Sequence, residues 1–287
     1  MMRVLMLGLL VFAQASFSNG PPINAETAFV TGLNGAAFRT FGKVVRKSSS
    51  AGNLTAWTMP IIFPYELVEN KLVVGVGLPI VFSKILDLND GTKRSSDVGI
   101  GDLTFFGKFN IFQQDRHQET FRVAGKIGTT FPTGTFGVAS PQLGTGSVNP
   151  FIILIATKLW RRFGLNADVG YQAMTEVNGL KRGDLLRYDL AGSFRLLPWV
   201  YKTYPSHQLN LMLELNGAYT RQAYKDGKFE PNSGGNILFV SPGIQYIYDS
   251  VIVEASVQIP IPGASFVNGK QMKTDFAALL GIRWLIF

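Results

Sequence analysis

Cysteine is absent from the 287-residue chain, and histidine occurs only twice. Without cysteine there is no disulfide framework, no thiolate nucleophile and no cysteine-ligated metal site. The two histidines, His117 and His207, are far apart in the sequence, and no Gly-x-Ser-x-Gly nucleophile elbow accompanies them. Both are expected in turns, where a lone histidine is more often solvated than a metal ligand. The sequence therefore predicts neither an enzyme nor a cofactor or metal site.

Long apolar runs are also lacking after the first residues. The longest later run is Phe151 to Ala156, whereas a membrane-spanning helix needs roughly 18 apolar residues. At the N-terminus, Arg3, the apolar run Val4 to Phe12 and the tripeptide Ala13-Gln14-Ala15 form the pattern of a secretory signal peptide. An uncleaved anchor helix is the alternative, but the run is too short to span a bilayer.

We predict cleavage after Ala15, with a cut after Ser18 as the alternative. Residues 1–15, or 1–18, would then be the signal peptide, and residues 16–287 a single exported domain. Loss of Arg3 lowers the formal net charge of +8 by one and leaves the mature chain basic. Without a spanning helix, an exported chain can cross a membrane only as a closed barrel, because lipid offers no partners to an open sheet edge.

Apolar and polar residues alternate strictly along much of the chain, as in the segment 101–113. One face of that segment carries Leu103, Phe105, Phe109 and Ile111. The other face carries Asp102, Thr104, Lys108 and Asn110. A soluble sheet buries its apolar face, whereas a membrane barrel presents that face to lipid. The alternation predicts an all-β fold, an antiparallel transmembrane β-barrel in the bacterial outer membrane.

The connections between these segments alternate between short and long. The expected periplasmic turns are 69–70, 114–118, 161–162, 198–207 and 249–250. The expected outer loops are 48–53, 84–97, 132–147, 175–183, 226–235 and 262–271. Most of these are longer and rich in Gly, Ser, Asn and Lys. Short periplasmic turns with longer outer loops are typical of outer-membrane barrels, and the count comes to about twelve strands.

Two features conflict with regular strands. Prolines lie inside several expected strands, at Pro60, Pro64, Pro79, Pro242 and Pro260. Each removes a hydrogen-bond donor from the ladder, so in a closed barrel we expect these residues at bulges or strand ends. The segment 150–158 is apolar on both faces, and periodicity leaves its orientation open.

Several short motifs resemble one family of outer-membrane barrels. In order, they are Gly99-Ile100-Gly101-Asp102-Leu103, Phe131-Pro132-Thr133-Gly134, Gly144-Thr145-Gly146-Ser147 and the run from Phe163 to Tyr171. In this order and spacing they resemble the putative meta-pathway of phenol degradation family, and the resemblance covers most of the mature chain. It implies an outer-membrane protein that passes small, often aromatic compounds, and it implies no catalytic residues.

Parity places charges of both signs on the inner face of the barrel. The candidate lumen-lining residues are Asp102, Lys108, Arg122, Lys126, Asp168, Arg187, Asp189, Arg195, Glu214, Glu254, Lys273 and Asp275. They suit a pore wall that sets ion and solute selectivity. They also suit a lattice of cross-strand salt bridges that fills a narrow barrel, and both interpretations stay open. Inward-pointing Gly75, Gly77 and Gly128 reduce side-chain bulk and favour some internal space.

We therefore predict a passive channel for small solutes, aromatic or hydrophobic compounds among them. The alternative is a closed structural or surface-interaction barrel without transport. Expected partners are outer-membrane lipid and the barrel-assembly machinery, whereas nucleic acid is not expected for an exported barrel. Lipopolysaccharide phosphates are a further candidate partner, and simple solvation of the loops is the alternative. The loop cations in question are Lys84, Lys93, Arg94, Lys181, Arg182, Lys225, Lys228 and Lys270.

Overall fold

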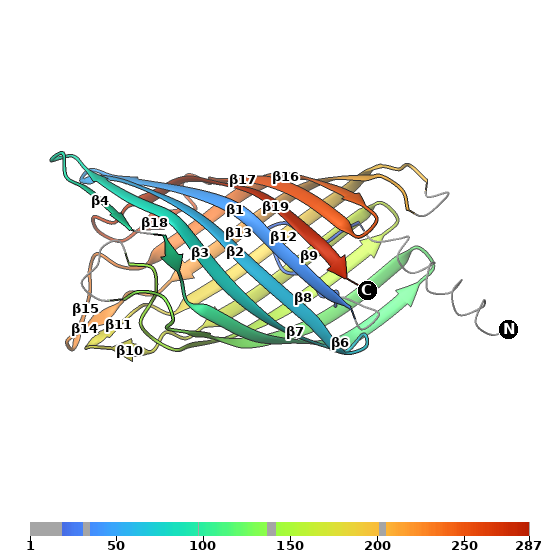
Figure 1. The fold of residues 1–287 in the computed structure, drawn as a ribbon, viewed down its shortest axis with the longest axis horizontal. Coiled ribbons are helices and arrows are strands. Elements are labelled where there is room, and N and C mark those ends of the chain that lie inside the picture. The colour runs from blue at the N-terminus through green and yellow to red at the C-terminus, as the bar shows by residue number, and fades with distance from the viewer. Residues whose placement is uncertain (1–18, 31–34, 97, 137–141, 201–204, 287) are drawn as a thin grey trace, which may run out of the picture.

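Twelve long antiparallel strands form a closed ring in the computed structural model, which describes residues 19–30, 35–96, 98–136, 142–200 and 205–286 (Figure 1). The expected signal peptide, 1–15 or 1–18, lies outside the described residues. The strands of the ring are β1 (Ala36–Ser49), β2 (Gly52–Val68), β3 (Leu72–Leu88), β6 (Leu103–Arg116), β7 (Glu119–Phe131), β8 (Asn149–Trp160), β9 (Phe163–Gln172), β12 (Leu185–Leu197), β13 (Gln208–Thr220), β16 (Gly235–Tyr248), β17 (Val251–Pro260) and β19 (Lys273–Ile286). The pairing of β19 with β1 closes the ring. The predicted antiparallel β-barrel of about twelve strands is confirmed.

Burial alternates along the strands with the predicted period of two. In β9, Asn166 and Asp168 are buried, whereas Leu165 and Val169 are exposed. The exposed positions form apolar rows, such as Trp57, Phe63, Tyr65 and Leu67 of β2. Polar side chains therefore surround a lumen, while apolar side chains meet lipid.

At the periplasmic end the ring strands are joined mostly by short turns. Four of these turns contain a residue other than glycine with a positive φ, namely Asn70, Gln118, Arg161 and Asp249. Positive φ is what tight hairpin turns demand, and the side chains of Asn and Asp tolerate it comparatively well. None of the described residues belongs to a helix long and apolar enough to cross a membrane.

Most connections at the outer end are longer and carry short strands of their own. These are β4 (Lys93–Ser96), β5 (Gly99–Ile100), β10 (Glu176–Val177), β11 (Leu180–Lys181), β14 (Tyr224–Lys225), β15 (Lys228–Phe229) and β18 (Phe266–Val267). In Figure 1 they gather at the end of the barrel opposite the start of β1 and the end of β19. β10, β11, β14 and β15 form a separate four-stranded sheet, built from the connection that precedes β12 and the connection that follows β13.

The prolines within the strands lie mainly where pairing with one neighbour lapses. Pairing of β1 with β2 is interrupted at Pro60 and Pro64, and pairing of β16 with β17 at Pro242, each time without a change of register. Each of these prolines still pairs with its other neighbour. Pro79 lies just beyond the end of the pairing between β3 and β6, and Pro260 ends β17. A strand end is thus correct for Pro260, but bulges are wrong for Pro60, Pro64 and Pro242, because the missing donor affects one ladder only.

Residues 19–30, here called the N-terminal segment, lie inside the barrel and account for the two apolar faces of β8. Ile153 and Ile155 of β8 point inward and pack against Ala28 of the segment. Leu154, on the opposite face, is 51% exposed toward the lipid. Both faces are apolar because one meets lipid and the other meets the N-terminal segment.

Candidate channel lumen

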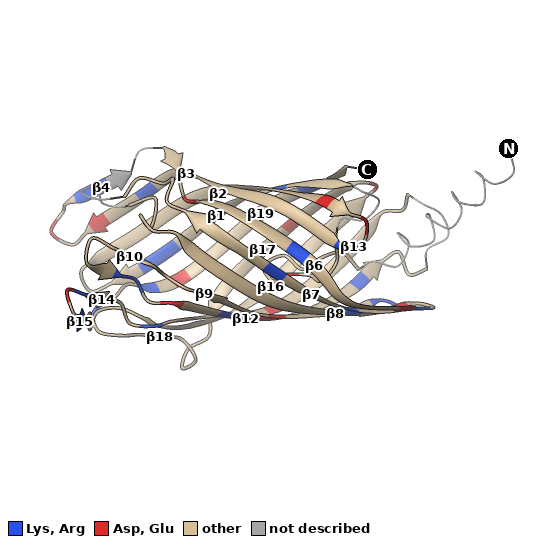
Figure 2. Ribbon diagram, turned by 90° about the horizontal axis from the view of Figure 1, so that it is seen from below, with Lys and Arg blue, Asp and Glu red and all other residues tan. Residues whose placement is uncertain are grey.

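The N-terminal segment crosses the lumen, and side chains from all around the ring bind its backbone. They are Arg39 of β1, Lys108 of β6, Thr157 of β8, Asp168 of β9, Asn210 and Glu214 of β13, Gln245 of β16 and Arg283 of β19. Figure 2 shows how charged positions are spread over the strands that enclose this space. The prediction placed residues 16–287 in one barrel domain and did not distinguish an internal segment from the strands.

Glu214 holds the middle of the segment. Its buried carboxylate accepts hydrogen bonds from the backbone N–H groups of Ile23, Asn24 and Ala25, at 2.6, 2.9 and 2.9 Å. Successive N–H groups that converge in this way bind an anion well, and hydrogen bonds to a charged acceptor are about twice as strong as neutral ones. A single wall residue therefore fixes three consecutive residues of the segment.

Glu254 of β17 forms a second centre with two arginines. Its carboxylate lies 2.9 Å from the guanidinium nitrogens of both Arg39 and Arg283, and its side chain is fully buried. The same arginines donate to the segment, Arg39 to the carbonyl of Ile23 and Arg283 to that of Pro22, each at 2.5 Å. The arginines are therefore shared between a wall carboxylate and the backbone of the segment.

A third group of charges holds the segment around Glu26. The Glu26 carboxylate forms an ion pair with Lys126 of β7. The backbone N–H of Glu26 donates to Asp168 at 2.8 Å, and Lys108 donates to the carbonyl of Thr27 at 3.2 Å. The Glu26 carboxylate thus faces a lysine, while the backbone N–H of Glu26 faces the carboxylate of Asp168.

Apolar contacts complete the attachment of the segment. Ile23 is buried against Met212 and Leu279, with Phe41 packed beside them. Burial of an isoleucine side chain contributes about 1.5–3 kcal/mol. The segment is therefore anchored by an apolar side chain as well as by polar bonds.

Five of the predicted lumen residues contact the N-terminal segment directly and a sixth reaches it through another side chain; the six are Lys108, Arg122, Lys126, Asp168, Glu214 and Glu254. Of these, Glu254 acts through Arg39, and Arg122 places its guanidinium 4.7 Å from the ring centre of Phe29. Arg39 was missing from the prediction, although Arg39, Phe41 and Lys43 follow the same period of two. Wall charges in this part of the lumen therefore bind an internal segment.

Asp102, at the outer end, binds the connection between β7 and β8. It accepts hydrogen bonds from the N–H groups of Gly134 and Thr145, at 3.0 and 2.7 Å, and from the Thr145 hydroxyl at 2.6 Å. A Cβ at Gly144 would lie 2.4 Å from a carboxylate oxygen of Asp102, so this close approach requires glycine. Asp102 thereby draws the connection between β7 and β8 against the lumen wall.

The remaining predicted residues lie at several levels of the barrel. Arg187 is exposed on the inner face of β12, and Asp189 next to it is buried and accepts a hydrogen bond from Asn216 at 3.0 Å. Arg195 is buried. Lys273 and Asp275 lie exposed at the outer end of β19, where Asp275 accepts a hydrogen bond from Ser48 at 2.6 Å.

Aromatic rings fill the space left by two of the inward-pointing glycines. A Cβ at Gly75 would lie 2.3 Å from the Phe106 ring, and one at Gly128 would lie 2.5 Å from the Phe151 ring. The expected gain of internal space is therefore wrong at these two positions. At Gly77 the nearest neighbouring atom would be 3.8 Å away.

A cavity of about 650 Å³ lies at the outer end of the lumen. Its wall combines apolar residues, among them Pro79, Leu143 and Met174, with the cations Lys84 and Arg182. Both cations were grouped with the outer loops in the sequence analysis. They point to this cavity, where Lys84 donates to the backbone carbonyl of Gln142 at 2.6 Å and Arg182 to its side-chain oxygen at 3.0 Å.

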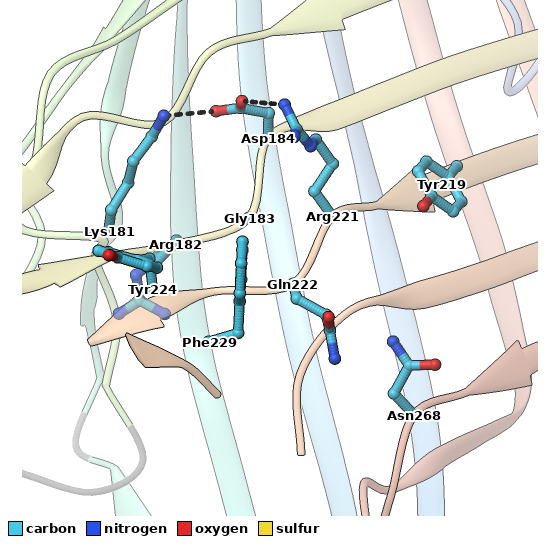
Figure 3. A pocket seen from close by; sticks show the side chains of 10 residues that line it. All are labelled: Lys181, Arg182, Gly183, Asp184, Tyr219, Arg221, Gln222, Tyr224, Phe229 and Asn268. Carbon is cyan, nitrogen blue, oxygen red and sulfur yellow. Dashed lines mark ion pairs between the residues drawn. The ribbon is translucent and has the colours of Figure 1, made fainter. Parts of the chain in front are cut away.

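A second cavity, of about 550 Å³, lies between the outer connections beside β12 and β13 (Figure 3). Lys181 and Arg221 both face the carboxylate of Asp184, at 3.7 Å each. Burial alone would raise the pKa of Asp184, but hydrogen bonds from the Met174 N–H and the Tyr171 hydroxyl, together with the two cations, lower it. Asp184 is therefore ionised at neutral pH.

The solved structures that resemble this chain are outer-membrane barrels. The COG4313 outer membrane channel from Pseudomonas putida F1 has a TM-score of 0.74 at 11% identity, covering 92% of this chain and 100% of that chain. The β domain of the Bordetella autotransporter BrkA has a TM-score of 0.48 at 11% identity, covering 88% and 99%. The first likeness shows the fold, and the second is too distant to support an argument.

No curated protein matches the sequence. A family model matches residues 19–267, which include the N-terminal segment and most of the barrel. Its description is "Putative MetA-pathway of phenol degradation". The match agrees with the resemblance found in the short glycine-rich motifs, and the chain belongs to this family of outer-membrane barrels.

Proposed function

We propose that the protein is a passive outer-membrane channel for small solutes, with aromatic or hydrophobic compounds as its substrate class. The cavity of about 650 Å³ at the outer end of the lumen carries this proposal. Its volume lies within the range of small-molecule sites, and its wall is partly apolar. The family description, which refers to phenol degradation, supports an aromatic solute.

In this proposal a solute enters from outside, rests in the cavity and then meets the N-terminal segment. The segment occupies the lumen but pairs with no strand of the ring. The segment is kept in place by side-chain hydrogen bonds, ion pairs and the packing of a few apolar groups. Passage then requires a local shift of the segment while the barrel itself stays closed. No catalytic residue, cofactor or energy source enters this mechanism, and we propose that the protein is not an enzyme.

Solute uptake into liposomes tests the proposal. The refolded protein should admit phenol-sized aromatics faster than sugars of higher polarity, since the cavity offers apolar contacts. Liposomes that contain heat-unfolded protein are the control. Lack of flux through a correctly folded barrel would contradict the channel.

The competing proposal is a closed barrel that serves a structural or surface-interaction role. The many bonds between the lumen wall and the N-terminal segment favour it, because a permanently fixed segment would block transport. The uptake experiment separates the two functions, since only the channel yields a solute flux that depends on the protein.

We also propose that lipopolysaccharide binds beside the cavity of Figure 3. Tyr171 and Tyr219 belong to the lipid-facing rows and are 42% and 43% exposed. The Tyr171 hydroxyl donates to Asp184 at 2.8 Å, which places Asp184, Lys181 and Arg221 directly above the lipid-facing surface. Phosphates of the outer leaflet would meet these cations there. Arg221 is 65% exposed and available to them.

Export and insertion complete the proposal. We infer that a signal peptide of residues 1–15, or 1–18, is removed and that the barrel-assembly machinery inserts the chain. The carbonyl of Asn19, a fully buried residue, accepts a hydrogen bond from Asn210 at 2.6 Å. A cut after Ser18 would thus place the new amino terminus inside the lumen, whereas a cut after Ala15 leaves three more residues. The intact mass of the mature protein distinguishes the two sites.

A further inference from the structure

The outer half of the lumen carries a group of cations, here called the outer cations. They are Lys43 and Lys47 of β1, Lys84 of β3, Arg182 before β12, and Arg187 of β12. Among the described residues, no carboxylate forms an ion pair with any of them. Apart from Asp102 and the rim residue Asp275, the carboxylates of the lumen described above gather deeper, around the N-terminal segment, where other cations accompany them.

The outer cations lie on the outer side of the N-terminal segment. Arg39 of β1 binds the segment, and Lys43 and Lys47 follow it toward the outer end of the strand. Four residues of a strand span about 13 Å. Lys43 pairs with buried Leu279, which places it on the inner face. A solute that enters from outside therefore reaches these cations before it reaches the segment.

The five side chains form one positive field. Arg187 lies close enough to Lys43 for the two positive charges to repel each other. Lys47 and Arg182 both repel Lys84 in the same way. On the side toward the N-terminal segment, Arg187 also interacts with the carboxylates of Glu26, Asp168 and Asp189. These negative charges limit the positive field on that side. Like charges gathered in a cleft with low-dielectric walls attract a counter-ion.

The cavity of about 650 Å³ places apolar surface next to this field. Lys84 and Arg182 share its wall with Leu143 and Met174. The Nε of Arg182 is buried and has no hydrogen-bond partner among the described residues, and its guanidinium lies 5.8 Å from the ring centre of Phe136. A ligand with both an anionic group and an apolar body would satisfy both parts of this wall.

Among the described residues that line the cavity, Asp102 is the only one with a carboxylate, and this carboxylate is bound elsewhere. Asp102 already accepts three hydrogen bonds from the connection between β7 and β8, at 2.6 to 3.0 Å. Its oxygens point to Gly134 and Thr145, so they do not neutralise Lys84 or Arg182 by direct contact. The cations of the cavity remain available to an anion.

We propose that the outer cavity binds the carboxylate of an otherwise apolar aromatic acid, with its anion on Lys84 and Arg182 and its ring against Leu143 and Met174. This inference rests on the proposed channel and narrows its substrate class from aromatic solutes to aromatic anions. Arginine and lysine form short, charge-assisted hydrogen bonds with a carboxylate, and the other outer cations raise the local concentration of the anion.

Fluorine NMR on the refolded full-length protein tests the inference with para-fluorobenzoate and its neutral analogue para-fluorobenzamide. We expect para-fluorobenzoate to bind more tightly than the amide, and its binding to weaken with salt. The double variant Lys84→Gln/Arg182→Gln should weaken benzoate binding by at least about tenfold, because each lost charged hydrogen bond corresponds to roughly that factor. It should leave amide binding unchanged.

The matched control is Lys93→Gln/Arg94→Gln, which removes two loop cations outside the cavity. Equal affinity for acid and amide, or equal losses in the two double variants, would overturn the inference. Para-fluorobenzyl alcohol uptake into liposomes is measured in parallel. Uptake of the neutral alcohol without binding of the acid would refute the anion site alone, whereas absence of any uptake would refute the channel.

Discussion

The buried charge of Glu254 in the lumen is tolerable because two arginines pair with it. The Glu254 side chain is fully buried and lies 2.9 Å from both Arg39 and Arg283. Glu254→Gln removes the negative charge and leaves two guanidiniums close together. Loss of one partner of a buried ion pair costs about 3–5 kcal/mol. We expect a loss of this size in the free energy of unfolding, measured with urea in lipid vesicles.

The matched control for Glu254→Gln is Asp275→Asn. Asp275 forms its ion pair with Arg46 at 3.7 Å at the exposed outer rim. Surface pairs of this kind contribute only about 0–1 kcal/mol. Equal losses in both variants would show that burial does not set the strength of the Glu254 interactions.

At the level of single residues, the sequence predicts orientation better than role. Parity predicted an inner position for Glu214, Glu254 and Asp168, because a period of two follows from strand geometry, and all three are buried. Parity contains no information on what lies opposite an inward side chain. The contacts of Glu214 with Ile23 and Ala25 join residues about 190 positions apart, and no local pattern encodes them.

The N-terminal segment is the element whose stability is most open to experiment. Glu214 supplies acceptors for three of its backbone N–H groups. Because the chain has no cysteine, Ala25→Cys provides a unique thiol at a buried position. Adding Glu214→Ala should speed labelling by a maleimide at least about tenfold, because hydrogen bonds to charged groups contribute about 1.5–3 kcal/mol each.

Asp102→Asn in the same Ala25→Cys background is the control, since Asp102 binds the connection between β7 and β8 and not the segment. Labelling that is as slow with Glu214→Ala as with Asp102→Asn would mean that the other contacts hold the segment without Glu214. The result bears on transport, because the channel requires the segment to move.

Strands and turns were largely predictable, because lipid and hairpin geometry constrain each of them locally. Apolar rows, tight turns and the number of strands all follow from these constraints. The exceptions have a common physical cause. β8 and the N-terminal segment depend on each other, through Ile153, Ile155 and Ala28. Neither could be oriented without knowledge of the other.

The molecule as a whole is polarised along the barrel axis. Cations predominate in the outer lumen, and Lys181 and Arg221 lie beside Asp184 above the lipid-facing surface. Some of the predicted loop cations therefore face two different cavities. Lys84 and Arg182 serve the lumen cavity, whereas Lys181 lies in the cavity beside the lipid-facing tyrosine Tyr219. Sequence identified the charges of this group but not the space that each one faces.

Lipopolysaccharide should stabilise the folded barrel if its phosphates bind Lys181 and Arg221, because a ligand that binds only the folded state raises the free energy of unfolding. In vesicles with and without lipopolysaccharide, the double variant Lys181→Gln/Arg221→Gln should lose most of this stabilisation at low salt. The difference should shrink at high salt, since salt screens exposed charges. Lys158→Gln is the control, because Lys158 pairs with Glu119 near the periplasmic end. Equal stabilisation of the double variant and of Lys158→Gln would contradict a phosphate site at Lys181 and Arg221.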